Sequence, residues 1–293
     1  MASFVFTGTA TGHTNMLAKI KEHLTDGATL GTQVWTAIGT NPVYFKGPGL
    51  AQTDNIYLQM LAYSNVNIDQ FGLQCYGAVN YNSLNSFYAQ PGQSPPAYIP
   101  LWDSEIPYWL IVNGRRFILI AKVSTTYQTY YGGFILPYAT PAEMPYPIVN
   151  MGSVGGQDST VRWSAGDYRV SGFWDPVENS SFLRHWNGTW IPIQNVQNRS
   201  DGNRTELGDH NVWPYEKDYG FGLNQDGSYG LLPCVIHSNY GSGNVIGELD
   251  GVYFCTGFSN AAEDIITVGA DQYLVVQSAY RTGRRDYAAI KLG

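Results

Sequence analysis

The pattern of hydrophobic positions predicts a chain built mostly of β-strands. Short runs of branched and aromatic residues recur along it, separated by turn-forming residues. In the first half these runs cover 33–37, 43–46, 55–63, 70–79, 108–123 and 125–136, and in the second half 160–164, 168–173, 231–236, 251–257, 273–280 and 286–292. The proline-rich segments 90–107 and 137–147 predict ordered but non-regular connections.

One segment near the start has helical spacing. Its apolar residues fall on one face of a helix: Met16, Leu17, Ile20 and Leu24. Thr14 and Asn15 precede them and are typical capping residues. Asp26-Gly27 follows and should end the helix. We therefore expect a short N-terminal helix that packs through this apolar face.

The stretch YWLIVNGRRFILIAKV, residues 108–123, predicts a β-hairpin. Asn113-Gly114 separates two apolar runs, and this dipeptide favours a two-residue type I′ turn. Both residues should then have positive φ. Val112 should pair with Arg115, and Ile111 with Arg116.

The two faces of this hairpin raise a question, because both are almost wholly apolar. Alternation places Arg115 and Arg116 on opposite faces at the tip. It then assigns Phe117, Leu119 and Ala121 to one face, and Ile118, Ile120 and Lys122 to the other. A half-solvated strand would alternate apolar and polar residues. Both faces should therefore be buried as far as Ile120, with Lys122 at the margin, under the protein's own sandwich or under a neighbouring chain.

These elements predict a mainly β protein, a distorted β-sandwich with a short N-terminal helix and a loop-rich insertion. We divide the chain into an N-terminal helical or docking segment (1–40), a β domain (41–149), a loop-rich insertion or second domain (150–245) and C-terminal strands that return to the β body (246–293). The insertion is rich in Gly, Asn, Asp and Ser, and Asn187-Gly188 predicts a hairpin within it.

Composition adds a prediction about partners. Charged residues make up only 13% of the chain and hydrophobic residues 44%, with 22 Tyr, 8 Trp and 33 Gly. A surface so poor in charge favours coverage by other protein chains. The alternative is a neutral surface of Asn, Ser, Thr and Gln.

Net charge and the lack of targeting signals argue against nucleic-acid-binding, membrane and secreted proteins. The net charge is −7 and the 16 basic residues are scattered, which argues against a nucleic-acid partner. The densest basic groups, Arg115-Arg116 and 281–285, are interpreted as turn residues and solvated strand ends. We expect no membrane segment and no signal peptide. Cys75, Cys234 and Cys255 are interpreted as reduced, buried residues of a protein made in a cytoplasm.

Candidate chemistry is sparse. Asp103/Glu105 and Asp175/Glu178 could supply the two carboxylates of a glycoside hydrolase, but caps and turns explain such pairs equally well. Residues 224–227 favour a tight turn over a calcium loop. The five histidines lack metal-ligand spacing. We predict no enzymatic activity, no cofactor, and no catalytic or metal-binding residue.

Aromatic residues could serve as sugar platforms, as protein interfaces or as core. In strands we expect most of them to be core. They are Tyr108, Trp109, Tyr127, Tyr130, Tyr131, Trp163, Trp174, Trp186, Trp190 and Trp213.

Two stretches carry a resemblance. Residues 106–148, IPYWLIVNGRRFILIAKVSTTYQTYYGGFILPYATPAEMPYPI, and residues 247–292, GELDGVYFCTGFSNAAEDIITVGADQYLVVQSAYRTGRRDYAAIKL, resemble structural proteins of tailed-bacteriophage virions. Together they cover about a third of the chain. The resemblance implies a virion component of the tail, baseplate or fibre-attachment region. Its expected partners are other virion proteins and copies of itself. The alternative is a receptor-binding module or depolymerase that contacts a host surface glycan.

Overall fold

The computed structural model describes residues 3–138, 147–154, 156, 173, 180–185, 187–192, 194–195, 224, 226–238, 244–283 and 286–293. These residues form three antiparallel sheets and a short N-terminal helix. The predicted class, a mainly β sandwich-like protein with one N-terminal helix, is confirmed. The predicted strands 160–164 and most of 168–173 lie outside the described residues, and so does most of 137–147. The division into four segments stays a prediction.

The first sheet has five strands in sequence order. They are β2 (Thr36–Ile38), β3 (Val43–Gly47), β4 (Ile56–Asn65), β5 (Gln70–Ala78) and β6 (Ala97–Leu101). Strand β6 lies within 90–107, where we expected no regular structure. Because β6 is an edge strand, Pro100 needs no ladder donor on its free side and is tolerated opposite Gly72.

The central sheet has the strand order β1-β7-β8-β9-β11-β12-β13. Its strands are β1 (Phe4–Ala10), β7 (Ile106–Val112), β8 (Arg116–Val123), β9 (Thr126–Phe134), β11 (Ile148–Met151), β12 (Ser181–Arg184) and β13 (Trp190–Pro192). Strand β1 was not predicted. It pairs along its whole length with β7, almost a hundred residues away in sequence. The hairpin predicted at Asn187-Gly188 is confirmed as β12–β13, with Gly188 at φ 84°.

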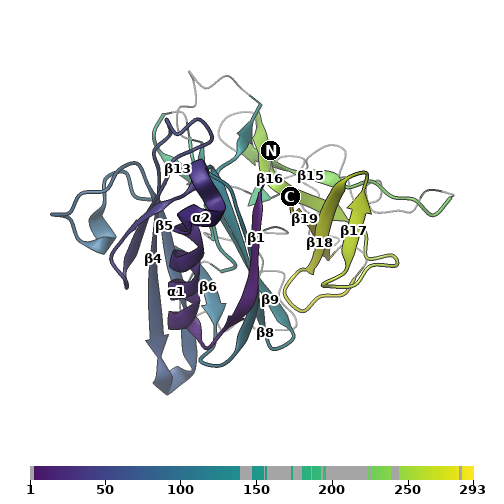
Figure 1. Ribbon diagram of the computed structural model, residues 1–293, viewed down its shortest axis with the longest axis horizontal. Coiled ribbons are helices and arrows are strands. Elements are labelled where there is room, and N and C mark those ends of the chain that lie inside the picture. Colours follow the sequence, from purple (N-terminus) through teal and green to yellow (C-terminus); the bar gives the residue numbers. More distant parts are fainter. Residues whose placement is uncertain are drawn as a thin grey trace, which may run out of the picture.

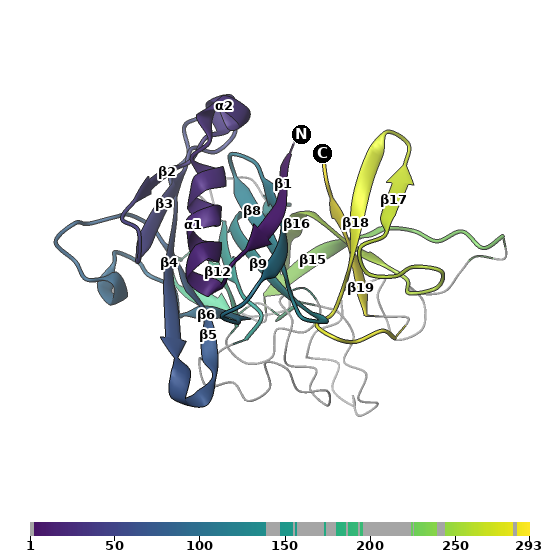
Figure 2. The same ribbon diagram turned by 60° about the horizontal axis from the view of Figure 1, so that its bottom comes forward.

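The third sheet is formed mostly by the C-terminal part of the chain. Its strands, in spatial order, are β14 (Gln194–Asn195), β15 (Leu232–Ser238), β16 (Asn244–Cys255), β19 (Tyr287–Lys291), β18 (Asp271–Gln277) and β17 (Ile265–Val268), and β10 (Leu136–Pro137) also pairs with β16. Figures 1 and 2 show the first sheet on the left, the strands β1, β8 and β9 in the middle and the third sheet on the right. The sandwich therefore has three layers.

Two hydrophobic cores fill the spaces between the layers. The first core lies between the first and central sheets and includes Phe117, Leu119 and Ala121. The second core lies between the central and third sheets and includes Ile118 and Ile120. The predicted division of β8 into two buried faces is confirmed, and Lys122 is partly exposed at the margin. The strand is apolar on both faces because layers of the same chain cover both.

Helix α1 (His13–Leu24) packs on the first core through the predicted face. Its start differs from the prediction. The N-cap is Gly12, at φ 140°, and Asn15 acts from inside the first turn, where its Oδ1 accepts a hydrogen bond from the Thr11 N–H (3.0 Å). The helix ends just before the predicted Asp26-Gly27, at Leu24 with Thr25 as its C-cap, and Asp26 instead caps the next helix, α2 (Gly27–Leu30). Three 3₁₀ turns follow along the chain, η1 (Gly31–Gln33), η2 (Val66–Ile68) and η3 (Phe87–Ala89).

The turn between β7 and β8 differs from the predicted type I′ turn. Val112 pairs with Phe117, and the Asn113 N–H donates to the Arg116 carbonyl (3.0 Å), so Gly114 and Arg115 are the central residues. Neither Asn113 nor Gly114 has positive φ. The prediction was wrong because the Asn113 side chain holds the turn, accepting hydrogen bonds from the N–H groups of Arg115 (2.8 Å) and Arg116 (3.0 Å).

Gly114 is needed for a different reason, the close approach of another loop. Its carbonyl accepts a hydrogen bond from the Gly49 N–H (2.7 Å), and its N–H donates to Oε1 of Gln33 (2.9 Å). A Cβ at this position would collide with the Gly49 carbonyl oxygen. The glycine therefore provides space rather than an unusual backbone angle.

Candidate functional site

Three sheet edges stand out because nothing in their sequences blocks pairing with another strand. Strands β1, β2 and β17 each end a sheet, and their sequences FVFTGTA, TAI and IITV contain no charged residue and no proline. Natural proteins place charges or proline on free edges to prevent such pairing. The other ends of the first and central sheets, β6 and β13, do contain proline. We call β1, β2 and β17 the unguarded edges.

Exposed apolar side chains lie along these same edges. Ile38 in β2 is 51% exposed, and in β17 Ile265 is 50% and Val268 52% exposed. Val5 in β1 is exposed as well. Within the described residues, no backbone hydrogen bond continues any of the three sheets beyond these strands. Each edge therefore offers free backbone groups together with apolar side chains.

Strand β17 is the clearest case. It lies at the outer end of the third sheet in Figures 1 and 2. Ile265 pairs with Leu274, whose side chain is buried in the second core, yet half of Ile265 is exposed. The apolar face of the third sheet thus extends past the layer that covers it.

Two projecting segments of the first sheet also expose apolar residues. The β4–β5 hairpin ends in η2, where Val66 and Ile68 are exposed. The long connection from β5 to β6 exposes Leu84 and Tyr88, and it projects to the far left in Figures 1 and 2. Isolated exposed apolar residues are common on protein surfaces, so these carry less weight than the edges.

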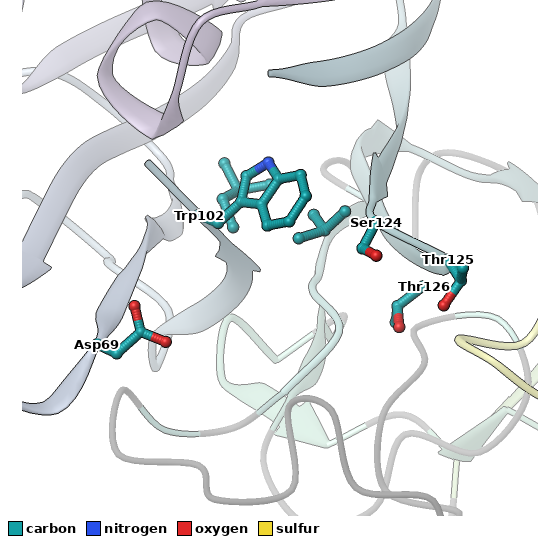
Figure 3. A pocket seen from close by; sticks show the side chains of 7 residues that line it. Asp69, Trp102, Ser124, Thr125 and Thr126 are labelled. Atoms are coloured by element: carbon teal, nitrogen blue, oxygen red, sulfur yellow. The ribbon is translucent and has the colours of Figure 1, made fainter. Parts of the chain in front are cut away.

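A pocket of about 360 Å³ lies where the first and central sheets meet. The described part of its lining comes from the β4–β5 turn, the end of β6 and the β8–β9 turn. These residues are Asp69, Leu101, Trp102, Val123, Ser124, Thr125 and Thr126. Figure 3 shows Trp102 between Asp69 on one side and the hydroxyl-bearing turn on the other. We call it the Trp102 pocket. Trp102 was absent from the aromatic residues singled out in the sequence.

The carboxylate pair Asp103/Glu105 lies directly after this pocket but does not line it. Both side chains are exposed, on the turn between β6 and β7. The Glu105 carbonyl accepts a hydrogen bond from the Trp102 indole N–H (2.9 Å). Asp103 Oδ1 lies 3.8 Å from Nδ1 of His13. Burial lowers the pKa of His13, and the Asp103 carboxylate opposes this effect. Asp175 and Glu178 lie outside the described residues.

Most of the remaining candidate residues lie in the core where the structure describes them. Tyr108, Tyr127, Tyr130 and Tyr131 are buried, as expected for core, whereas Trp109 and Trp190 are partly exposed. Trp163, Trp174, Trp186 and Trp213 lie outside the described residues. The three cysteines are buried, and none of them forms a disulfide within the described part of the chain. Gly227, at φ 81°, donates to the Asn224 carbonyl (2.9 Å), which confirms a tight turn there.

Arg116 contradicts its interpretation as a solvated turn residue. Its side chain is 1% exposed and its Nε lies 3.3 Å from Oδ2 of Asp250. It also donates to the Ile111 carbonyl (3.2 Å) and to the Ser3 hydroxyl (3.0 Å). Because a buried guanidinium needs compensation on every side, these partners fix the central hairpin against β16. The role is architectural.

Comparison of the chain with protein-family models finds no match, and comparison with curated proteins finds none either. In the described ranges, no three His, Cys, Asp or Glu side chains gather as ligands for a metal ion. Among the described helices α1 is the longest, at 12 residues, and none has the length and apolarity that crossing a lipid bilayer requires.

Proposed function

We propose that this protein is a structural component of a bacteriophage virion, in the tail, baseplate or fibre-attachment region. It acts by assembling with other virion proteins and with copies of itself, and it needs no cofactor. The virion assignment is supported by the resemblance of 106–148 and 247–292 to tailed-phage structural proteins. The low share of charged residues, 13%, supports assembly.

The observation that carries the assembly role is the set of unguarded edges. A free strand with apolar side chains can add a strand of another chain, with backbone hydrogen bonds for affinity and side-chain contacts for specificity. Strand β17 offers this most fully, because its two half-exposed residues, Ile265 and Val268, lie on opposite faces of the strand. We expect each specific contact to bury at least about 1,000 Å².

Charge placed on β17 tests this role. The double variant Ile265→Lys/Val268→Lys should fold as the wild type does, because both side chains are half exposed, but it should no longer associate. Leu84→Lys is the matched control, since Leu84 is an exposed apolar residue away from any sheet edge. Sedimentation over a concentration series measures self-association.

Incorporation into particles supplies the second measurement. Mass spectrometry of phage particles made from the genome that encodes this chain should find the wild type and the Leu84→Lys control, and should find the β17 variant depleted. A wild-type chain that stays monomeric at every concentration and is missing from the particles would refute the proposal.

The alternative function is a carbohydrate-contacting receptor-binding module or depolymerase on the same particle. The Trp102 pocket favours the binding form of this alternative, because it combines an aromatic ring with hydroxyl groups. The depolymerase form has less support, since Asp103 and Glu105 are exposed and lie outside that pocket.

A further inference from the structure

We propose that the Trp102 pocket, in which an indole ring lies between the Asp69 carboxylate and three hydroxyl groups, binds one or two units of an uncharged saccharide. This inference goes beyond assembly and does not depend on it. It assigns a ligand class to a site formed by both the first and central sheets.

The shape of the pocket suits a small polar ligand. Its volume of about 360 Å³ lies near the lower end of the range for small-molecule sites. The described lining comes from three separate segments, the turns after β4 and β8 and the end of β6. Because paired strands hold all three segments, the pocket is largely preformed.

Trp102 is held in place by its own hydrogen bonds. The indole N–H donates to the Glu105 carbonyl (2.9 Å), and the Trp102 carbonyl accepts from the His13 N–H (3.1 Å). The buried His13 ring lies against Phe71, with 5.2 Å between ring centroids, and supports this end of α1. With its nitrogen occupied, the partly exposed indole offers the ligand only its carbon surface. Sugars present C–H groups on one ring face that suit such a surface.

The hydroxyl groups of the β8–β9 turn supply the polar contacts. Within the described residues, none of the side chains of Ser124, Thr125 and Thr126 has a hydrogen-bond partner. Each hydroxyl can donate one hydrogen bond and accept two. Three consecutive hydroxyls next to a cavity match the alternating donors and acceptors of a sugar.

Charge restricts the ligand further. Among the described residues that line the pocket, Asp69 is the charged one. A carboxylate repels phosphorylated, sulfated and acidic sugars, whereas it can accept hydrogen bonds from the hydroxyls of a neutral one. The pocket therefore favours a neutral saccharide over an anionic one.

The backbone at two lining residues adds support. Asp69 (φ 50°) and Ser124 (φ 57°) both adopt left-handed conformations that non-glycine residues rarely take. Ser124 is the first residue of the two-residue turn that joins Val123 to Thr126, a position that glycine favours. Retaining serine there keeps a hydroxyl at the pocket at some conformational cost.

This geometry provides a test in which loss of binding cannot arise from unfolding. Ser124→Gly removes the hydroxyl but relaxes the turn, so the variant should be at least as stable as the wild type. The full-length protein is screened against immobilised neutral, uronic-acid-containing and sialylated oligosaccharides. The best neutral ligand is then titrated by calorimetry. We expect wild-type binding to a neutral glycan, and binding about fivefold weaker for Ser124→Gly, which corresponds to the loss of one hydrogen bond.

Further variants locate the site and its selectivity. Trp102→Ala should weaken binding at least tenfold, and Asp69→Asn should allow uronic-acid glycans to bind. Leu84→Ala, far along the β5–β6 connection, should bind as the wild type does. Absence of neutral-glycan binding by the wild type would overturn the proposal. Unchanged binding by both Ser124→Gly and Trp102→Ala would overturn it too. Neither result touches assembly, which is read from the β17 variant.

Discussion

Strands β8 and β17 look alike in sequence and differ in their surroundings. Both are runs of branched apolar residues, RFILIAKV and IITV. In β8, every residue from Phe117 to Ala121 is completely buried, whereas in β17 Ile265 and Val268 are half exposed. The difference lies in position, because β8 has a strand on either side and a core on each face.

The comparison teaches that an apolar strand is not by itself a core strand. Both β8 and β17 could be taken for core on composition alone. Only the order of strands in the sheets separates the strand that organises the interior from the one that remains free to meet another chain. The strongest tests therefore place the same change in both strands.

The largest expected contrast comes from the same Ile→Ala substitution made once in β8 and once in β17. Ile118→Ala should lower the free energy of unfolding by about 4 kcal/mol, because it leaves a cavity in the second core. Ile265→Ala should lower it by less than about 1 kcal/mol, because half of that side chain is already in water. Urea unfolding of the two variants measures both values. Equal losses would show that β17 is as enclosed as β8.

The next contrast uses the neighbouring arginines at the tip of the central hairpin. Arg116→Gln should cost about 3 kcal/mol, because it leaves Asp250 facing a neutral side chain in a largely buried place. Arg115→Gln should cost less than about 1 kcal/mol, since Arg115 is partly exposed and, among the described residues, its guanidinium donates to a single neutral acceptor, the Ile135 carbonyl (3.1 Å). Denaturant midpoints at neutral pH compare them. An Arg116→Gln variant that is as stable as Arg115→Gln would mean that Arg116 is not needed for stability.

The smallest contrast concerns two Asn-Gly turns. Gly114→Ala should cost about 2 kcal/mol, because the new Cβ collides with the Gly49 carbonyl. Gly188→Ala should cost about 1 kcal/mol, from its positive φ alone, since the nearest atom to its Cβ is the end of the Arg184 side chain at 3.4 Å. Thermal unfolding compares the stability losses of the two variants. A larger loss for Gly188→Ala than for Gly114→Ala would contradict the close approach of Gly49 to Gly114.

Local patterns predicted the parts of the fold that depend on local periodicity. The faces of α1 and of β8 follow from spacings of 3.6 and 2 residues, and both were predicted correctly. Strand β1 was missed because Thr7, Gly8 and Thr9 give it a polar, turn-like sequence, and its pairing with β7 is a distant contact. Arg116 was taken for a solvated residue because its partner Asp250 is 134 positions away.

The Trp102 pocket shows the same limit for sites. Asp69, Trp102 and Ser124 come from three turns whose proximity depends on how two sheets meet. No local motif marks them. A tryptophan directly after a buried strand was the one available signal. The unguarded edges, by contrast, could be recognised as soon as the strand order was known, because their lack of charge is visible in the sequence.

The layers of the sandwich are also synthesised in a fixed order. Among the described residues, every buried member of the first core lies between Ala10 and Ile148, whereas the third sheet is built almost entirely from residue 194 onwards. A ribosome therefore delivers all of the first core before it has made the strands that close the second. During that interval Ile118 and Ile120 form the open side of a half-finished sandwich, and the nascent chain must remain soluble until its C-terminal strands arrive.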